Sequence, residues 1–148
     1  MSLIVQKFGG SSVADKERLF NVAGIISDAY RGGDRIVVVV SAQGDTTDDL
    51  LAKAAEISDS PSKRELDMLL STGEQISASL LAIALGTMRI PVVSLNAWQV
   101  GISSDSNYSN AKIKKIDTER LLRELDGGKV VIVTGFQGIN KFDDVTTL

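Results

Sequence analysis

Short apolar runs alternate with stretches of helical periodicity along the whole chain. Runs rich in β-branched residues and bounded by turn residues are typical of strands buried in a parallel sheet. They predict strands at residues 3–6, 35–40, 91–95 and 129–133, and a more polar run predicts an exposed strand at 112–116. Apolar residues spaced three and four apart predict helices at 15–30, 46–57, 62–85 and 117–126.

Two local signals refine this pattern. Ser62 and Glu65 have the spacing of a capping box, and Gly73 predicts a break in the long helix that follows. Residues 97–111 are rich in Ser and Asn and are predicted to be irregular. Because strands and helices alternate, we predict an α/β fold with a mostly parallel sheet and helices on both of its faces.

Small, polar or glycine residues follow three of the predicted strands. These segments are Lys7-Phe8-Gly9-Gly10-Ser11, residues 41–47 and residues 134–138. In parallel α/β sheets, ligands bind at the carboxyl ends of the strands. We therefore expect the three segments to line one crevice, although Gly and Ser are also common in ordinary turns.

The first of these segments has the outline of an anion site. Gly9 and Gly10 let the backbone approach phosphate oxygens closely, and Lys7 adds a positive charge. A helix follows, so its positive amino-terminal end can point at the same place. The alternative is a plain turn with a solvated lysine. No strand is followed by G-x-G-x-x-G and no Walker A loop occurs, which disfavours a dinucleotide-binding or P-loop site.

Composition narrows the chemistry further. The chain has 148 residues, which predicts one domain, and it has no Cys and no His, which excludes disulfides, thiolate metal sites and His-dependent triads. The net charge of −3, without blocks of like charge, disfavours a nucleic-acid partner. We find no signal-peptide pattern and no apolar run of membrane-spanning length, so we expect a cytoplasmic protein with no membrane partner.

Four segments in register resemble the amino-terminal part of the aspartokinases, within the amino acid kinase superfamily. They are residues 7–12, 41–47, 72–74 and 135–138, and the resemblance extends over the whole chain. Gln43 departs from the pattern, in which Met is usual. The resemblance implies a three-layer α/β/α sandwich of the carbamate kinase type, truncated here: residues 1–148 would be the amino-terminal portion of the kinase domain. The nucleotide-binding half and the ACT regulatory domains would be absent.

The resemblance also implies roles for individual residues. Lys7 would be catalytic, stabilising charge on the transferring phosphoryl group. The ATP phosphates would be bound around Lys7, Phe8, Gly9, Gly10 and Ser11, and Mg²⁺ would be held through those phosphates and not by protein ligands. The amino acid would lie near Ser41, Thr47, Glu74, Gly135 and Phe136, with Glu74 suited to an α-ammonium group.

The implied activity is transfer of the ATP γ-phosphate to the side-chain carboxylate of L-aspartate. The product would be 4-phospho-L-aspartate, at the first step of lysine, threonine and methionine biosynthesis. The carboxylate is already ionised at pH 7, so a chain without His can support this reaction. We expect a homo-oligomer as the whole protein and little activity from the fragment alone. The alternatives are another amino acid kinase, acting on glutamate, acetylglutamate or a nucleotide, and a non-catalytic α/β ligand-binding module.

Overall fold

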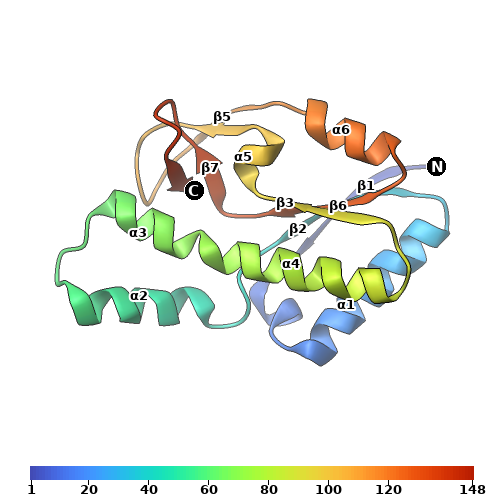
Figure 1. Ribbon diagram of the computed structural model, residues 1–148, viewed down its shortest axis with the longest axis horizontal. Coiled ribbons are helices and arrows are strands. Elements are labelled where there is room, and N and C mark those ends of the chain that lie inside the picture. Colours follow the sequence, from blue (N-terminus) through green and yellow to red (C-terminus); the bar gives the residue numbers. More distant parts are fainter.

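A four-stranded parallel sheet runs through the middle of the computed structural model, which describes residues 1–148 (Figure 1). The spatial order of its strands is β1 (Leu3–Phe8), β2 (Arg35–Val40), β6 (Val130–Thr134) and β3 (Val92–Leu95). All neighbouring pairs are parallel. This arrangement confirms the predicted α/β fold with a mostly parallel sheet.

Burial explains which strands lie at the centre. β6 is buried at every position and β2 at four of its six positions, as expected of valine-rich strands covered on both faces. The edge strand β1 alternates instead, because Ile4 and Phe8 pack against the core while Val5 and Lys7 are exposed. β1 is two residues longer than predicted and includes Lys7 and Phe8.

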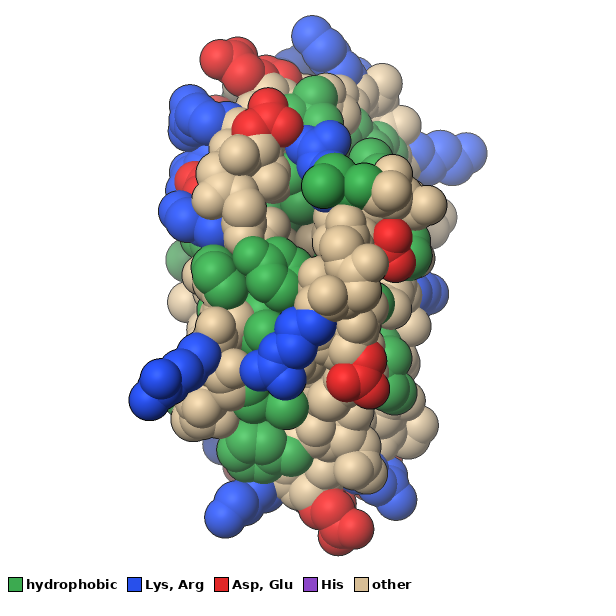
Figure 2. Space-filling model, turned by 90° about the vertical axis from the view of Figure 1, so that its right-hand side faces the viewer, with side chains coloured by type: hydrophobic (Ala, Val, Ile, Leu, Met, Phe, Trp, Pro, Cys, Tyr) green, Lys and Arg blue, Asp and Glu red, His purple; other side chains and the backbone are tan.

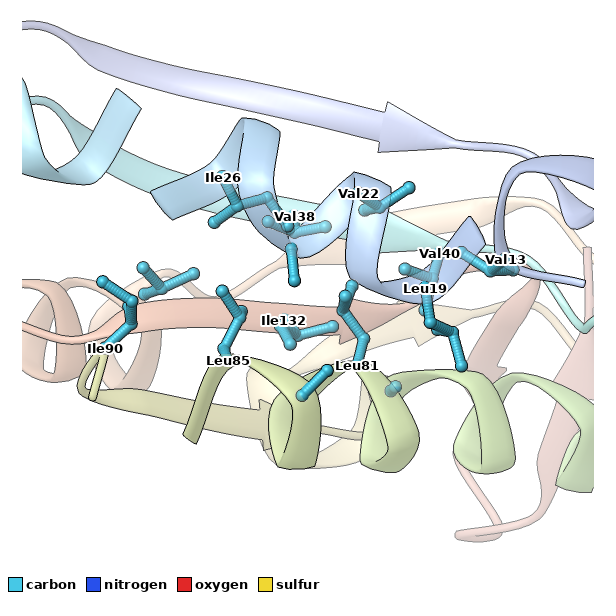
Figure 3. Close-up of a cluster of buried hydrophobic side chains, with 14 of the residues drawn as sticks. Val13, Leu19, Val22, Ile26, Val38, Val40, Leu81, Leu85, Ile90 and Ile132 are labelled. Atoms are coloured by element: carbon cyan, nitrogen blue, oxygen red, sulfur yellow. The ribbon is translucent and has the colours of Figure 1, made fainter. Parts of the chain in front are cut away.

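Helices α1 (Lys16–Arg31) and α4 (Thr72–Thr87) cover one face of the sheet. Figure 3 shows the resulting core, in which side chains from both helices meet those of β2 and β6. The labelled members are Val13, Leu19, Val22, Ile26, Val38, Val40, Leu81, Leu85, Ile90 and Ile132. The predicted helix at 15–30 is confirmed, with Asp15 as its N-cap accepting a 2.9 Å hydrogen bond from the Arg18 amide.

Helices α5 (Ala97–Val100) and α6 (Glu119–Asp126) cover the opposite face, which completes the three layers. A second, smaller core lies beneath them, formed by Val37, Leu95, Val100, Leu125, Val131 and Val133. This layer leaves the outer face of β1 open, where Leu3 is 53% exposed and Val5 is 64% exposed.

A second, mixed sheet was not predicted. Its order is β5 (Ile113–Ile116), β4 (Ile102–Ser104), β7 (Gln137–Ile139) and β8 (Val145–Thr147). Only β5 was predicted, and it is exposed at all four positions as expected. The segment 97–111, predicted to be irregular, therefore contains both α5 and β4. These elements are too short for periodicity to reveal them.

Helices α2 (Thr46–Ile57) and α3 (Lys63–Leu70) lead away from the sheet and back to α4. The predicted capping box does not form, because the Ser62 side chain makes no cap hydrogen bond and Glu65 pairs with Arg64 instead. The break in the long helix falls at Ser71, two residues before the predicted position at Gly73.

The stretch Lys63–Thr87, which joins α3 and α4, is long and apolar enough to cross a membrane by length and composition. The expectation that no such run exists is therefore wrong by this criterion, because the two helices follow each other through Ser71 almost without interruption. Half of the most apolar window is buried inside the fold, as in the core helix of a soluble protein. The burial favours a role in the core.

Candidate functional site

The ends of β1, β2 and β6 meet at one edge of the central sheet, as predicted. The Ser41 amide donates to the Phe8 carbonyl (3.2 Å), and the Gly135 amide donates to the Val40 carbonyl (2.9 Å). The segments that follow β1 and β2 are also joined by a 2.9 Å hydrogen bond between the amide of Gly44 and the carbonyl of Gly10. The loops are thus fixed to one another through their backbones.

Three glycines allow this close approach around residues 40–44. A Cβ at Gly10 would lie 2.7 Å from the Ala42 carbonyl oxygen, and one at Gly135 would lie 2.9 Å from the Val40 carbonyl oxygen. A Cβ at Gly73, in the first turn of α4, would lie 2.8 Å from the Ala42 Cβ. Gly9 differs from them, since no atom lies within 4 Å of its Cβ position. Of the two glycines of the predicted anion site, Gly9 is therefore the one open to a ligand.

Lys7 and Phe8 point to opposite sides of β1. Lys7 lies on the exposed face, and its ammonium group forms no hydrogen bond or ion pair. The Phe8 ring packs against the main core, so only its backbone faces the edge of the sheet. Lys7 therefore carries a free ammonium group two residues before the open Gly9 backbone.

The expected helix end at the anion site is not there. A 3₁₀ helix, η1 (Gly10–Val13), follows the glycine pair, and α1 begins only at Lys16. The Asp15 side chain caps α1 and accepts from the Arg18 amide, so one amide of its first turn is already satisfied. Ser11 is exposed, and its carbonyl accepts a 2.8 Å hydrogen bond from the Arg18 guanidinium. Positive charge at the site comes from Lys7, without help from this helix terminus.

Residues 43–47 turn the chain from β2 into α2. The Gln43 side-chain amide (Nε2) donates to the Val13 carbonyl (2.7 Å), and the Thr46 hydroxyl donates to the Gln43 backbone carbonyl. Gln43, which departs from the aspartokinase pattern, thereby ties this turn to η1. Thr47 is half-buried in the first turn of α2 and makes no side-chain hydrogen bond. Ser41 is also half-buried and likewise uses none of its hydroxyl capacity within the chain.

Glu74 is the most unusual group at this edge. It is 2% exposed, and its Oε1 accepts a 3.3 Å hydrogen bond from the Ala42 amide, while Oε2 is buried with no partner. Burial raises the pKa of Glu74 to about 7, against the opposing effect of hydrogen bonds from the Glu74 and Ala42 backbones. A buried carboxylate oxygen without a partner is costly, and a cationic ligand group would relieve that cost.

The turn after β6 brings a further residue to the site. Gly135 and Phe136 form the turn; Phe136 has a φ of 67° and is 37% exposed. The next residue, Gln137, is fully buried and was not singled out from the sequence. Its side chain donates to the Ser71 carbonyl and accepts from Thr134 and Ala97. The only signal in the sequence for a role of Gln137 is that it lies in segment 135–138, which resembles the aspartokinases.

The largest hollow in the molecule lies at the other end of the sheet. It encloses about 670 Å³ near the amino ends of the strands and is lined by Tyr30, Arg31, Arg35 and Lys129 among others. Figure 2 shows this end, where basic, acidic and apolar side chains are mixed. Arg35 is paired with Asp126 at 2.6 Å, and the Tyr30 hydroxyl donates to the Gly128 carbonyl. This hollow is separate from the edge that carries Glu74 and Lys7.

The chain is similar to known kinases over its whole length. The amino acid kinase family matches residues 2–144. An aspartokinase from Geobacillus stearothermophilus is 51% identical over 148 residues, which are the whole of this chain and 36% of that protein. The chain thus spans about a third of the length of the curated relatives it matches. No group of three His, Cys, Asp or Glu side chains in the structure is placed to hold a metal ion.

Solved structures agree in fold. The aspartate kinase from Synechocystis superposes with a TM-score of 0.82 and 47% identity, over 97% of this chain and 23% of that chain. Escherichia coli aspartokinase III, in complex with aspartate and ADP, gives a TM-score of 0.85 over the whole of this chain and 43% of that chain. At 21% identity the second likeness shows the fold alone.

Proposed function

Because the chain belongs to the amino acid kinase family, we propose that it is the amino-acid-binding part of an aspartate kinase. The observation that carries the proposal is Glu74, a buried carboxylate with one oxygen unpartnered, set beside the loop that follows β2. An α-ammonium group matches this oxygen in charge and in donors. The aspartokinases to which the chain is similar support aspartate as the amino acid.

The other end of the site suits phosphate. Lys7 is exposed and unpaired at the end of β1, and Gly9 offers a backbone open to close approach. We assign ATP to this side, with Phe8, Gly10 and Ser11 as its frame. Mg²⁺ bound through the ATP phosphates would neutralise part of their charge. We assign the remaining substrate contacts to the segments that follow β2 and β6, at Ser41, Thr47, Gly135 and Phe136.

The reaction needs positioning and charge stabilisation more than acid–base chemistry. A side-chain carboxylate oxygen of aspartate bonds to the γ-phosphorus while the bond from that phosphorus to the ADP oxygen breaks. An acyl phosphate and ADP form, and no proton has to be removed, because the carboxylate is ionised at pH 7. Lys7 stabilises the charge that spreads over the phosphoryl oxygens. Glu74 holds the ammonium end of the substrate.

The chain spans about a third of the length of its curated relatives, which supports a longer protein as the setting of this activity. We propose that residues 1–148 are the amino-terminal portion of a kinase domain, whose remainder supplies the nucleotide half and regulatory domains. The fragment alone is then expected to have little activity. We also expect the whole protein to act in the cytoplasm as a homo-oligomer. Ile76 and Ile83 on the outer face of α4, 48% and 65% exposed, are consistent with further packing there.

Hydroxylamine trapping of an acyl phosphate tests the proposal directly. The full-length protein that carries this chain, given Mg-ATP, is expected to yield hydroxamate with L-aspartate and little with L-glutamate. Lys7→Ala should lower turnover by about 10²–10³, since it removes one charge-stabilising donor. Lys114→Ala is the matched control, because Lys114 is exposed on β5, away from the site. Near-normal turnover in Lys7→Ala would overturn the catalytic assignment.

The substrate control separates the remaining alternatives. Product with glutamate, acetylglutamate or a nucleotide in place of aspartate would assign another amino acid kinase. Absence of product with every acceptor, from a protein that still binds ligand, would favour a non-catalytic binding module.

A further inference from the structure

Gln137 joins three segments that are distant in sequence. Its side chain is fully buried at the start of β7. Oε1 accepts hydrogen bonds from the Thr134 hydroxyl (2.6 Å) and the Ala97 amide (3.3 Å). Nε2 donates a 2.6 Å hydrogen bond to the Ser71 carbonyl. One amide thus connects the end of β6, the start of α5 and the junction between α3 and α4.

The junction at Ser71 leads directly to Glu74. α4 begins at Thr72, and Glu74 lies in its first turn. That turn is held on one side by Ala42, which packs against Gly73 and donates to Glu74 Oε1. On the other side it is held by the bond from Gln137 to Ser71. The first turn of α4, which carries Glu74, is therefore held between the segment after β2 and the segment after β6.

We propose that Gln137 is a positioning residue for substrate recognition, which fixes the spacing between Glu74 and the turn at Gly135–Phe136. Gln137 follows this turn immediately, so the bond to Ser71 sets how far the turn lies from the first turn of α4. This inference rests on the proposed function. With that spacing fixed, the site accepts an amino acid of one side-chain length and discriminates against a homologue longer by one methylene.

An amide is the side chain that this position requires. A single planar group accepts two hydrogen bonds and donates one. A carboxylate, a hydroxyl or an alkyl chain of similar size cannot make this combination of bonds. In its ionised form, Gln137→Glu keeps the shape and the two acceptor bonds but removes the donor to Ser71. It therefore cuts the one connection to α4 and leaves the other two in place.

The test compares Gln137→Glu with Gln99→Glu in the full-length protein. Gln99 lies on α5 and is exposed, and its Oε1 accepts a 2.9 Å bond from the Asn96 amide, which glutamate can also accept. We expect Gln137→Glu to raise the KM for aspartate about tenfold, as for the loss of one buried hydrogen bond, with kcat and the KM for ATP changed much less. The preference for aspartate over glutamate should fall by a similar factor. Gln99→Glu should match the wild type.

Hydrogen exchange supplies a second readout that does not depend on turnover. Amide protection across residues 72–76 should fall in Gln137→Glu and stay unchanged in Gln99→Glu. If the wild type makes no acyl phosphate but protection falls, the positioning role stands and the proposed function fails. If aspartate turnover, selectivity and protection in Gln137→Glu all equal those of Gln99→Glu, the inference is overturned. A uniform loss of kcat with an unchanged KM would overturn it as well.

Discussion

Two buried carboxylates lie on either side of the junction between α3 and α4, and they are used in opposite ways. Asp67 is fully buried and accepts four hydrogen bonds, from the backbone amides and the hydroxyls of Ser109 and Thr147. Glu74 is almost equally buried but accepts one hydrogen bond from a neighbouring segment, at Ala42, and leaves Oε2 without a partner. Both oxygens of the Asp67 carboxylate have hydrogen-bond partners, whereas one oxygen of the Glu74 carboxylate has none.

This difference in hydrogen bonding distinguishes a structural carboxylate from one that can bind a ligand. Asp67 ties α3 to β8 and to the loop before β5, and every one of its bonds is made within the chain. Glu74 carries a desolvation cost that the chain does not offset, and burial holds its pKa near 7. Burial alone would have grouped the two together, while the count of hydrogen bonds separates them.

Asp67→Ala is expected to have the largest effect on stability of the variants that test this difference. It leaves two amides and two hydroxyls without their acceptor, so we expect a loss of about 3–5 kcal/mol in the free energy of unfolding. Urea denaturation measures the change, with the exposed Asp59→Ala as its control. A loss in Asp67→Ala no larger than that in Asp59→Ala would mean that the four bonds add nothing to stability.

The pH dependence of stability tests the unpartnered state of Glu74 directly. The folded-state pKa of Glu74 is raised from 4.5 to about 7, so the folded protein binds a proton that the unfolded chain has lost. Stability from this group is complete below pH 4.5 and is lost as the pH rises to 7, by about 3 kcal/mol. Glu74→Gln should remove this slope. Parallel curves for the variant and the wild type between pH 4.5 and 8 would contradict the raised pKa.

Gly73→Ala tests the packing beside Glu74, because it disturbs the contact between Gly73 and Ala42. The added Cβ would lie 2.8 Å from that of Ala42, and we expect a net loss of about 1–2 kcal/mol after the gain in helix propensity. Gly86→Ala is the control on the same helix, since no atom lies within 4 Å of its Cβ position, and it should stabilise the protein. Thermal unfolding checks both; equal shifts in the two variants would show that the contact with Ala42 is loose.

Ser109→Ala is the smallest change. It removes one donor to Asp67, the 3.3 Å hydroxyl bond, and leaves the other three in place. We expect a loss of about 0.5–1 kcal/mol in the free energy of unfolding by urea. A loss as large as that of Asp67→Ala would show that the four bonds act as one unit and do not contribute singly.

The central sheet could be predicted from the sequence because its strands carry their own signal. Runs such as residues 35–40 and 129–133 are apolar throughout, and burial on both faces requires that pattern. The second sheet could not be predicted in this way, since β4, β7 and β8 have three residues each, and β4 joins β7 through the distant pair Ser103 and Ile139. The edge where the loops meet followed from the parallel topology.

Individual roles at the site were only partly predictable. Glu74 was singled out by resemblance, but its unpartnered oxygen depends on the packing of α4 against Ala42. The partners of Gln137 lie at Ser71, Ala97 and Thr134, and no local pattern relates these positions. A residue that connects three distant segments gives no periodic signal, so its role emerges only from the folded structure.

The place of β6 in the sheet determines when the core can close. β6 lies between β2 and β3 although it is the last of the four strands in sequence, so Val37 and Val93 acquire their common neighbour, Val131, late in synthesis. Until then β2 and β3 are unpaired on the sides that β6 will fill. We expect folding on the ribosome to wait for β6, because long-range parallel pairing is slow. During that interval the valine-rich β2 is the segment most exposed to aggregation.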